Sequence, residues 1–161
     1  MITKDQLIRF FALNISIIQK QCNGLTHEDS LLQPSFRGNC LNWVLGHILV
    51  GRDRVLRLLG EEPTLNEKVY ARYETDSDPI IEDEKHILSL IDLLGLLQTS
   101  QDRITAGMQR VSTEALANAS TTENSTKTVG DQIFGLYFHE TYHTGQTEFL
   151  RQLAGKNDKV I

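Results

Sequence analysis

The sequence has little cysteine and no long apolar run, and each shortage excludes a class of protein. Its two cysteines, Cys22 and Cys40, are too few for the disulfide framework of a small secreted domain and form no CxxC metal knuckle, so we expect free thiols. No run of about 18 or more uncharged apolar residues occurs, which argues against a membrane helix. Lys4, Asp5 and Arg9 stand where a signal peptide would need its apolar core. We therefore expect a cytoplasmic protein that has no membrane partner.

The sequence also has no excess of positively charged residues. The formal net charge is −5, whereas proteins that bind nucleic acid usually carry a basic patch, so we expect no nucleic-acid partner. The acidity is concentrated in residues 61–84, where nine acidic residues stand against Lys68 and Arg72. We interpret this stretch as a solvated connection followed by a helix N-terminus, whose dipole favours carboxylates. A cation-binding role is the alternative.

Strand-like alternation is absent, and the apolar residues follow the spacing of amphipathic helices instead. This spacing predicts helices over residues 4–22 and 40–59, a third that begins at Asp78 ahead of Pro79 and passes Met108, and a fourth from 128 to 155. The acidic turn at 82–84 allows a later start of the third helix. Apolar positions expected to face the core include Ile91, Phe138 and Phe149.

Four helices of this length in a chain of 161 residues predict one domain, 1–161, of the all-α class, folded as a four-helix bundle. The connections are long for a simple up-and-down bundle, so we expect at least one to cross the bundle or to contain a short helix. The polar run NASTTENSTKT, residues 118–128, is typical of a loop. Leucines outside the main stripes of the second and third helices predict a homodimer: Leu45, Leu49, Leu56, Leu90, Leu93 and Leu96.

Two histidines in the segment FHETYHTGQ are spaced for one helix face. His139 and His143 are four residues apart and share a stripe with Leu136 and Leu150, so both are expected to point inward. Imidazoles at this spacing can reach the same metal ion. The alternative is that they are packing histidines hydrogen-bonded to protein groups.

A third histidine favours the metal site over the packing interpretation, because His47 also lies on a core stripe. Each buried ring nitrogen left unmatched costs roughly 1 to 3 kcal/mol, and one divalent cation satisfies three rings together. Gly46, Gly51 and Gly145 flank the three histidines and are expected to let a helix or a ligand approach closely. On this chemistry we favour a metal site.

The segments LNWVLGHILVGRDRVLRLLG and HETYHTGQTEFLRQLAG make the sequence similar to the DinB superfamily, which includes the YfiT-like proteins and the bacillithiol and mycothiol S-transferases. The resemblance implies a bundle of up-down-down-up order, with the acidic connection between the second and third helices as a long crossover. It also implies a site for a divalent metal, commonly zinc or nickel, with His47, His139 and His143 as ligands. His27 and His86 match no part of the motif.

Three neutral ligands leave an ion its charge and an open position, as in catalytic zinc sites. Some members of the family bring a low-molecular-weight thiol to the metal, so the resemblance implies a metal-dependent S-transferase whose partners are a small thiol and a small electrophile. The alternatives are a non-catalytic, stress-related metal-binding bundle and a metal-dependent hydrolase.

No general base is identified by the sequence. Glu140 is turned about 100° from its neighbouring ligand, and Asn42 and Gln146 cannot act as bases. We expect Gln146 to hydrogen-bond a ligand or the substrate. Arg37 and Arg54 are candidates for binding a substrate carboxylate.

Overall fold

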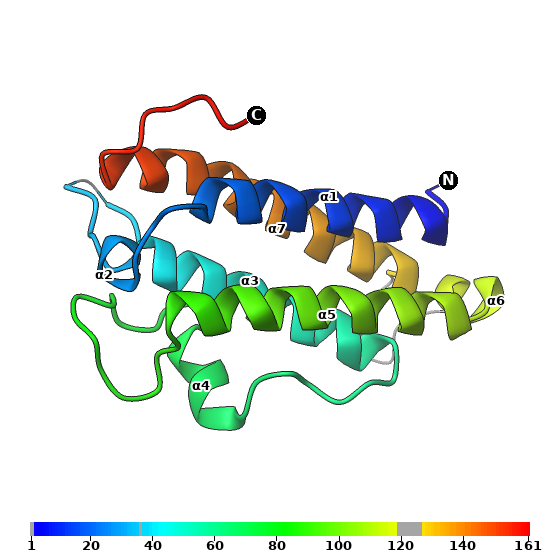
Figure 1. Ribbon diagram of the computed structural model, residues 1–161. Helices are drawn as coiled ribbons and strands as arrows, with labels where there is room; N and C mark the ends of the chain where they lie inside the picture. Colours follow the sequence, from blue (N-terminus) through cyan, green and yellow to red (C-terminus); the bar gives the residue numbers. More distant parts are fainter. Residues whose placement is uncertain (1, 36, 119–126) are drawn as a thin grey trace.

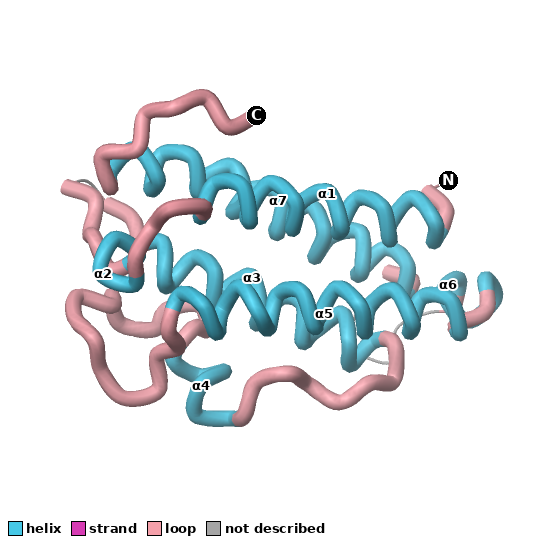
Figure 2. The backbone as a smooth tube through the Cα atoms, in the orientation of Figure 1, coloured by secondary structure: helices cyan, strands magenta, loops and turns pink. Residues whose placement is uncertain are grey.

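The computed structural model describes residues 2–35, 37–118 and 127–161. These residues form helices and no strand, so the expected all-α class is confirmed (Figure 2). The helices are α1 (Lys4–Cys22), α2 (His27–Ser30), α3 (Leu41–Leu58), α4 (Glu67–Arg72), α5 (Leu90–Arg110), α6 (Thr113–Ala117) and α7 (Val129–Leu153). Of the loop predicted at 118–128, residues 119–126 lie outside the described part.

The four long helices, α1, α3, α5 and α7, form the bundle. α1 packs against α5 and α7, and α3 packs against the same two helices from the other side. α1 and α7 run in one direction, while α3 and α5 run in the other (Figure 1). The connection from α3 to α5 therefore travels the length of the bundle, and it contains α4. The expectation that a long connection contains a short helix is confirmed, and α2 and α6 give further examples.

The helix ends are set by local signals. Thr3 and Gln6 form a capping box at the start of α1, and Thr128 and Asp131 form one at the start of α7. Gly60 and Gly155, which follow the ends of α3 and α7, have φ angles of 76° and 77°. This left-handed conformation stops a helix and is open to glycine without strain.

The predicted start of the third helix at Asp78 is wrong. α5 begins at Leu90, and the side chain of Ser89 caps it by accepting a hydrogen bond from the Asp92 N–H. His86 has a φ of 71°, which no right-handed helix allows, and the Leu88 N–H donates to the Tyr73 hydroxyl instead of to a helical carbonyl. Tertiary contacts of the crossover thus outcompete the local signal of Asp78 and Pro79.

The core also corrects several assignments of apolar residues. Ile91 is 79% exposed, because Leu90, Leu93 and Leu97 take the inward positions of α5. Phe138 and Phe149 are each 67% exposed, so they do not belong to the inward stripe of α7.

The leucines from which a homodimer was predicted are used inside the bundle. Five of them are buried, and Leu96 is partly buried against the apolar cluster that contains Leu45, Leu49, Leu90 and Leu93, so these residues leave no free face for a partner. Both cysteines are free and buried, as expected. No helix within the described residues is long and apolar enough to cross a membrane.

Candidate metal centre

The structure brings together the three histidines that the sequence singles out. His47 comes from α3, and His139 and His143 come from successive turns of α7. One nitrogen of each ring lies within 4.8 Å of the others. The Nε2 atoms of His139 and His143 are 3.2 Å apart, and the His47 ring centroid is 5.1 and 5.0 Å from those of His139 and His143. His27 and His86 lie outside this group.

His47 is oriented by the crossover. Its Nδ1 lies 2.7 Å from the main-chain carbonyl oxygen of Tyr73. A carbonyl oxygen can only accept, so Nδ1 carries the proton, and the lone pair is left on Nε2. Trp43 stacks on the same imidazole at 4.5 Å between centroids, and its indole N–H donates to the Ser77 hydroxyl. The ring is thus held in place and in one tautomer.

The close approach of Tyr73 depends on Gly46. A Cβ atom at position 46 would lie 2.1 Å from the Tyr73 ring, which is fully buried against this glycine. The expectation of close packing at Gly46 is confirmed. At Gly51 and Gly145, by contrast, a Cβ atom would meet no other atom within 4 Å, so these glycines border open space rather than a packed helix.

Asn42 secures the same segment instead of contacting the histidines. Its amide oxygen accepts from the Tyr73 hydroxyl at 2.9 Å, and its amide nitrogen donates to the Leu88 carbonyl at 2.9 Å. The Tyr73 hydroxyl accepts from the Leu88 N–H at 2.7 Å. α3, Tyr73 and the residues just before α5 are therefore joined to one another.

His143 is oriented by its own helix. Its Nδ1 lies 2.8 Å from the Gln146 amide oxygen, so Gln146 contacts a candidate ligand. With Nδ1–H donating to that oxygen, the lone pair of His143 is on Nε2, which faces His139.

The surroundings of the three rings favour their neutral form. Burial lowers the pKa of His47, His139 and His143 below the ordinary 6.5. Neighbouring imidazoles lower each of the three pKa values further, and Arg54 adds to the effect at His47 and His139. The hydrogen bond of His47 with Tyr73 and that of His143 with Gln146 raise the pKa of each ring and so offset part of this lowering. Neutral imidazole is the form that binds a metal.

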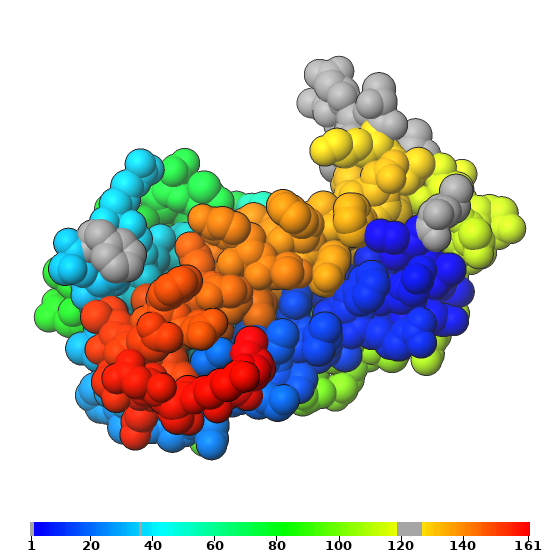
Figure 3. Space-filling view, turned by 90° about the horizontal axis from the view of Figure 1, so that it is seen from above, coloured from blue at the N-terminus to red at the C-terminus, as the bar shows by residue number. Residues whose placement is uncertain are grey.

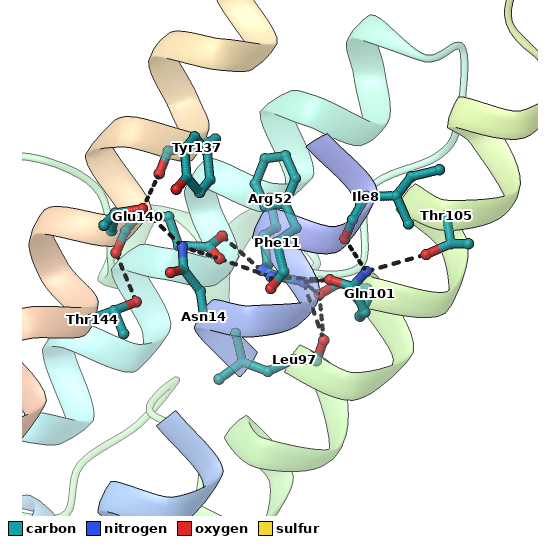
Figure 4. Close-up of polar contacts among 12 residues, drawn as sticks. Ile8, Phe11, Asn14, Arg52, Leu97, Gln101, Thr105, Tyr137, Glu140 and Thr144 are labelled. Atoms are coloured by element: carbon teal, nitrogen blue, oxygen red, sulfur yellow. Dashed lines mark hydrogen bonds and ion pairs between the residues drawn. The ribbon is translucent and has the colours of Figure 1, made fainter. Parts of the chain in front are cut away.

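Glu140 is excluded as a base at this site. It follows His139 in the chain but points into the bundle, where Arg52 donates to both of its carboxylate oxygens (Figure 4). Arg52 was not among the candidate residues predicted from the sequence. A signal was present, because Arg52 interrupts the row Leu45, Leu49, Leu56 at helical spacing, and a charge in such a row must be buried with a partner.

The two arginines considered as carboxylate binders differ in placement. Arg37 is exposed. Arg54 is held by the Tyr70 hydroxyl at 3.1 Å and by Glu74 at 3.2 Å.

The surface is hollowed alongside α7, between the crossover and the start of α7 (Figure 3). His139 and His143 are only partly buried, so the helix that carries them is accessible to small molecules.

The fold matches a solved structure, and the sequence matches a family model. A conserved protein of Enterococcus faecalis, known from its crystal structure, has a TM-score of 0.75 and 16% identity over 97% of this chain and 99% of its own. At this identity the likeness concerns the fold alone. No curated protein shows a significant match. The family model of the DinB superfamily matches residues 14–147 and so spans all three histidines. The chain therefore belongs to the DinB superfamily.

Proposed function

We propose that the protein binds one divalent metal ion through the Nε2 atoms of His47, His139 and His143. The observation that carries this proposal is that the Tyr73 carbonyl holds His47 in the tautomer that leaves Nε2 unprotonated, while the Gln146 amide oxygen faces Nδ1 of His143. A zinc–nitrogen bond of about 2.0 to 2.1 Å places two nitrogens of one tetrahedral ion about 3.3 to 3.4 Å apart. The 3.2 Å between the His139 and His143 nitrogens fits this requirement.

Imidazole ligands suit zinc and nickel, and we propose these two as the resident metals. When bound, the ion would supply an open position and a positive charge that lowers the pKa of a coordinated thiol or water. The chain itself contributes no charge to the ligand set, because its three rings are neutral. This favours anionic ligands such as a thiolate at the open position.

We further propose that the reaction is the transfer of a low-molecular-weight thiol to a small electrophile. A sulfur–carbon bond forms, the leaving group departs with its electron pair, and the thiol proton goes to solvent, because Glu140 is committed to Arg52. Membership of the DinB superfamily and the neutral donor set support this proposal.

A non-catalytic metal site is the second candidate, and one observation favours it. The three ligands join α3 to α7, and His47 is only 4% exposed and tied to the crossover. An ion there would hold three parts of the fold together. The two candidates differ in what a substitution of His47 changes.

Metal binding is tested by elemental analysis of protein purified without a chelator or a histidine tag. We expect about one divalent ion per chain in the wild type and none in His143→Ala, since a site with two of three ligands binds weakly. His27→Ala is the matched control and should retain the ion, because His27 lies outside the group. A wild type that contains no ion and takes none up would contradict the proposal.

Catalysis is tested with cobalt-substituted protein and four thiols: bacillithiol, mycothiol, glutathione and coenzyme A. The matching thiol should produce a sulfur-to-metal charge-transfer band and should react faster with a model electrophile than in buffer. His47→Ala, shown to be folded by circular dichroism, should lose that rate. If His47→Ala only lowers the melting temperature and no thiol gives the band, the ion is structural or serves hydrolysis.

A further inference from the structure

The centre of the bundle contains a charged pair that the proposed reaction does not use. Arg52 of α3 is 0% exposed and Glu140 of α7 is 3% exposed. Arg52 Nε donates to Glu140 Oε2 and Nη2 donates to Oε1, both at 2.8 Å (Figure 4). Two parallel bonds of this kind fix both the distance and the angle between the side chains.

The pair connects all four long helices. Arg52 also donates to the Phe11 carbonyl of α1 at 3.2 Å and to the Ser100 hydroxyl of α5 at 3.1 Å. Its contacts with Gln101 Oε1 are 3.3 and 3.4 Å long. Glu140 Oε1 in turn accepts from Asn14 of α1 at 3.2 Å. The guanidinium and the carboxylate are thus satisfied on every side.

Such a pair is a poor source of stability. Removing two charges from water costs about as much as their attraction returns, and apolar residues of similar size often serve stability equally well. The neighbours of Arg52 in its own helical row are leucines, whereas the groups that its guanidinium reaches on α1 and α5 are polar. Directional bonds differ from apolar contacts in that they are lost when one helix slides or turns relative to another. The pair therefore sets the register between α3 and α7.

That register decides whether the histidines meet. Glu140 directly follows His139, and Arg52 lies five residues after His47 on the same rigid helix. A shift of α7 by a single residue would move its ligands by about 1.5 Å and turn them by about 100°. A metal site tolerates errors of only about 0.2 Å in its ligand distances.

We propose that the pair of Arg52 and Glu140 positions the metal centre, by holding His139 and His143 of α7 opposite His47 of α3. Neither residue is a ligand, and both act through the helices that carry the ligands. This inference rests on the proposed metal site. It assigns to the pair a role that its contribution to stability does not require.

The test replaces the pair by apolar residues in the full chain, as Arg52→Met with Glu140→Met, and measures the binding of cobalt(II). We expect a folded protein whose cobalt affinity is about 10- to 100-fold lower, as for the loss of groups that orient ligands. The d–d absorption bands of cobalt should also broaden or shift, because they report ligand geometry. Wild-type affinity with wild-type bands would overturn the proposal.

Two further variants make the result decisive. Arg52→Lys keeps the charge but loses the two-pronged contact, so its bands should shift as well; unchanged bands overturn the proposal even if the double variant does not fold. Arg151→Met is the matched control, since Arg151 is a buried arginine that also ties α7 to α1, through the carbonyls of Gln21 and Asn23. Arg151→Met should leave the cobalt bands unchanged. If its bands shift as much as those of the double variant, the shift reports a general loosening of the bundle, and the proposal is overturned. If the wild type binds no cobalt, the proposed metal site itself is refuted. This outcome differs from cobalt binding that is the same in the wild type and in the variants of the pair.

Discussion

The carbonyl oxygen of Tyr73 lies 2.7 Å from Nδ1 of His47, so a residue of the crossover orients a candidate ligand on α3. This contact requires the Tyr73 ring to pack directly on the α3 backbone, which only the missing side chain of Gly46 permits. The crossover is therefore part of the candidate metal centre, although it contributes no ligand.

Gly46→Ala should weaken metal binding. The new methyl group would collide with the Tyr73 ring, and moving the ring also moves the carbonyl that His47 needs. We expect a loss of about 10- to 100-fold in cobalt affinity and a decrease of about 1 to 3 kcal/mol in the free energy of unfolding. Gly95→Ala is the control, because nothing lies within 4 Å of its Cβ position. Gly95→Ala should increase the free energy of unfolding by about 0.5 to 1 kcal/mol and leave the cobalt affinity unchanged.

Gln146→Ala should reduce metal affinity by less than His143→Ala does. Without the amide oxygen, His143 loses the hydrogen bond that fixes its tautomer and ring orientation, while the ligand itself remains. A decrease of about tenfold is expected by titration with zinc against a competing dye. Glu148→Ala, an exposed change on the same helix, should have no effect. Equal affinities for wild type and Gln146→Ala would show that Gln146 does not support the ligand.

The stability of the metal-free protein should depend on pH through the three histidines. Folding lowers their pKa values below 6.5, so the unfolded chain binds protons more readily than the folded one. Their contribution to stability is complete above pH 6.5 and is lost as the pH falls from 6.5 towards the lowered values. Metal should be released over the same range, because imidazolium cannot bind it. Denaturant unfolding between about pH 5 and 8 measures the effect, which should be smaller in His139→Ala.

We predict a homodimer that forms through the outer face of α7. This face carries the exposed residues Phe134, Phe138, Tyr142, Phe149 and Leu153, which follow helical spacing along most of the helix. An exposed apolar stripe of this kind is typical of an interface. Light scattering should give twice the mass of the 18.2 kDa chain for the wild type and a single chain for Phe149→Glu. Ile91→Glu, an isolated exposed apolar position on α5, should remain dimeric.

The sequence by itself determined the features that depend on neighbours within about one helical turn. The spacing of apolar residues predicted α1 over residues 4–22 and α7 within residues 128–155. The spacing of His139 and His143 placed both rings on one face. His47 was identified because a histidine on an apolar stripe needs a partner. Each of these inferences uses contacts between residues three to four positions apart, which the chain order already contains.

Only the tertiary structure decided where distant segments meet. Arg52 and Glu140 are 88 positions apart in the chain, and His47 and Tyr73 are 26 apart. No local pattern states which arginine pairs with which carboxylate, or that a tyrosine of the crossover will pack on Gly46. The start of α5 was mispredicted for the same reason. Asp78 and Pro79 favour a helix locally, but burial of Ile80 and the bonds of Tyr73 to Leu88 and Asn42 hold the crossover in another conformation. Packing free energy summed over several distant contacts exceeds the propensity of a single cap, so the tertiary contacts prevail.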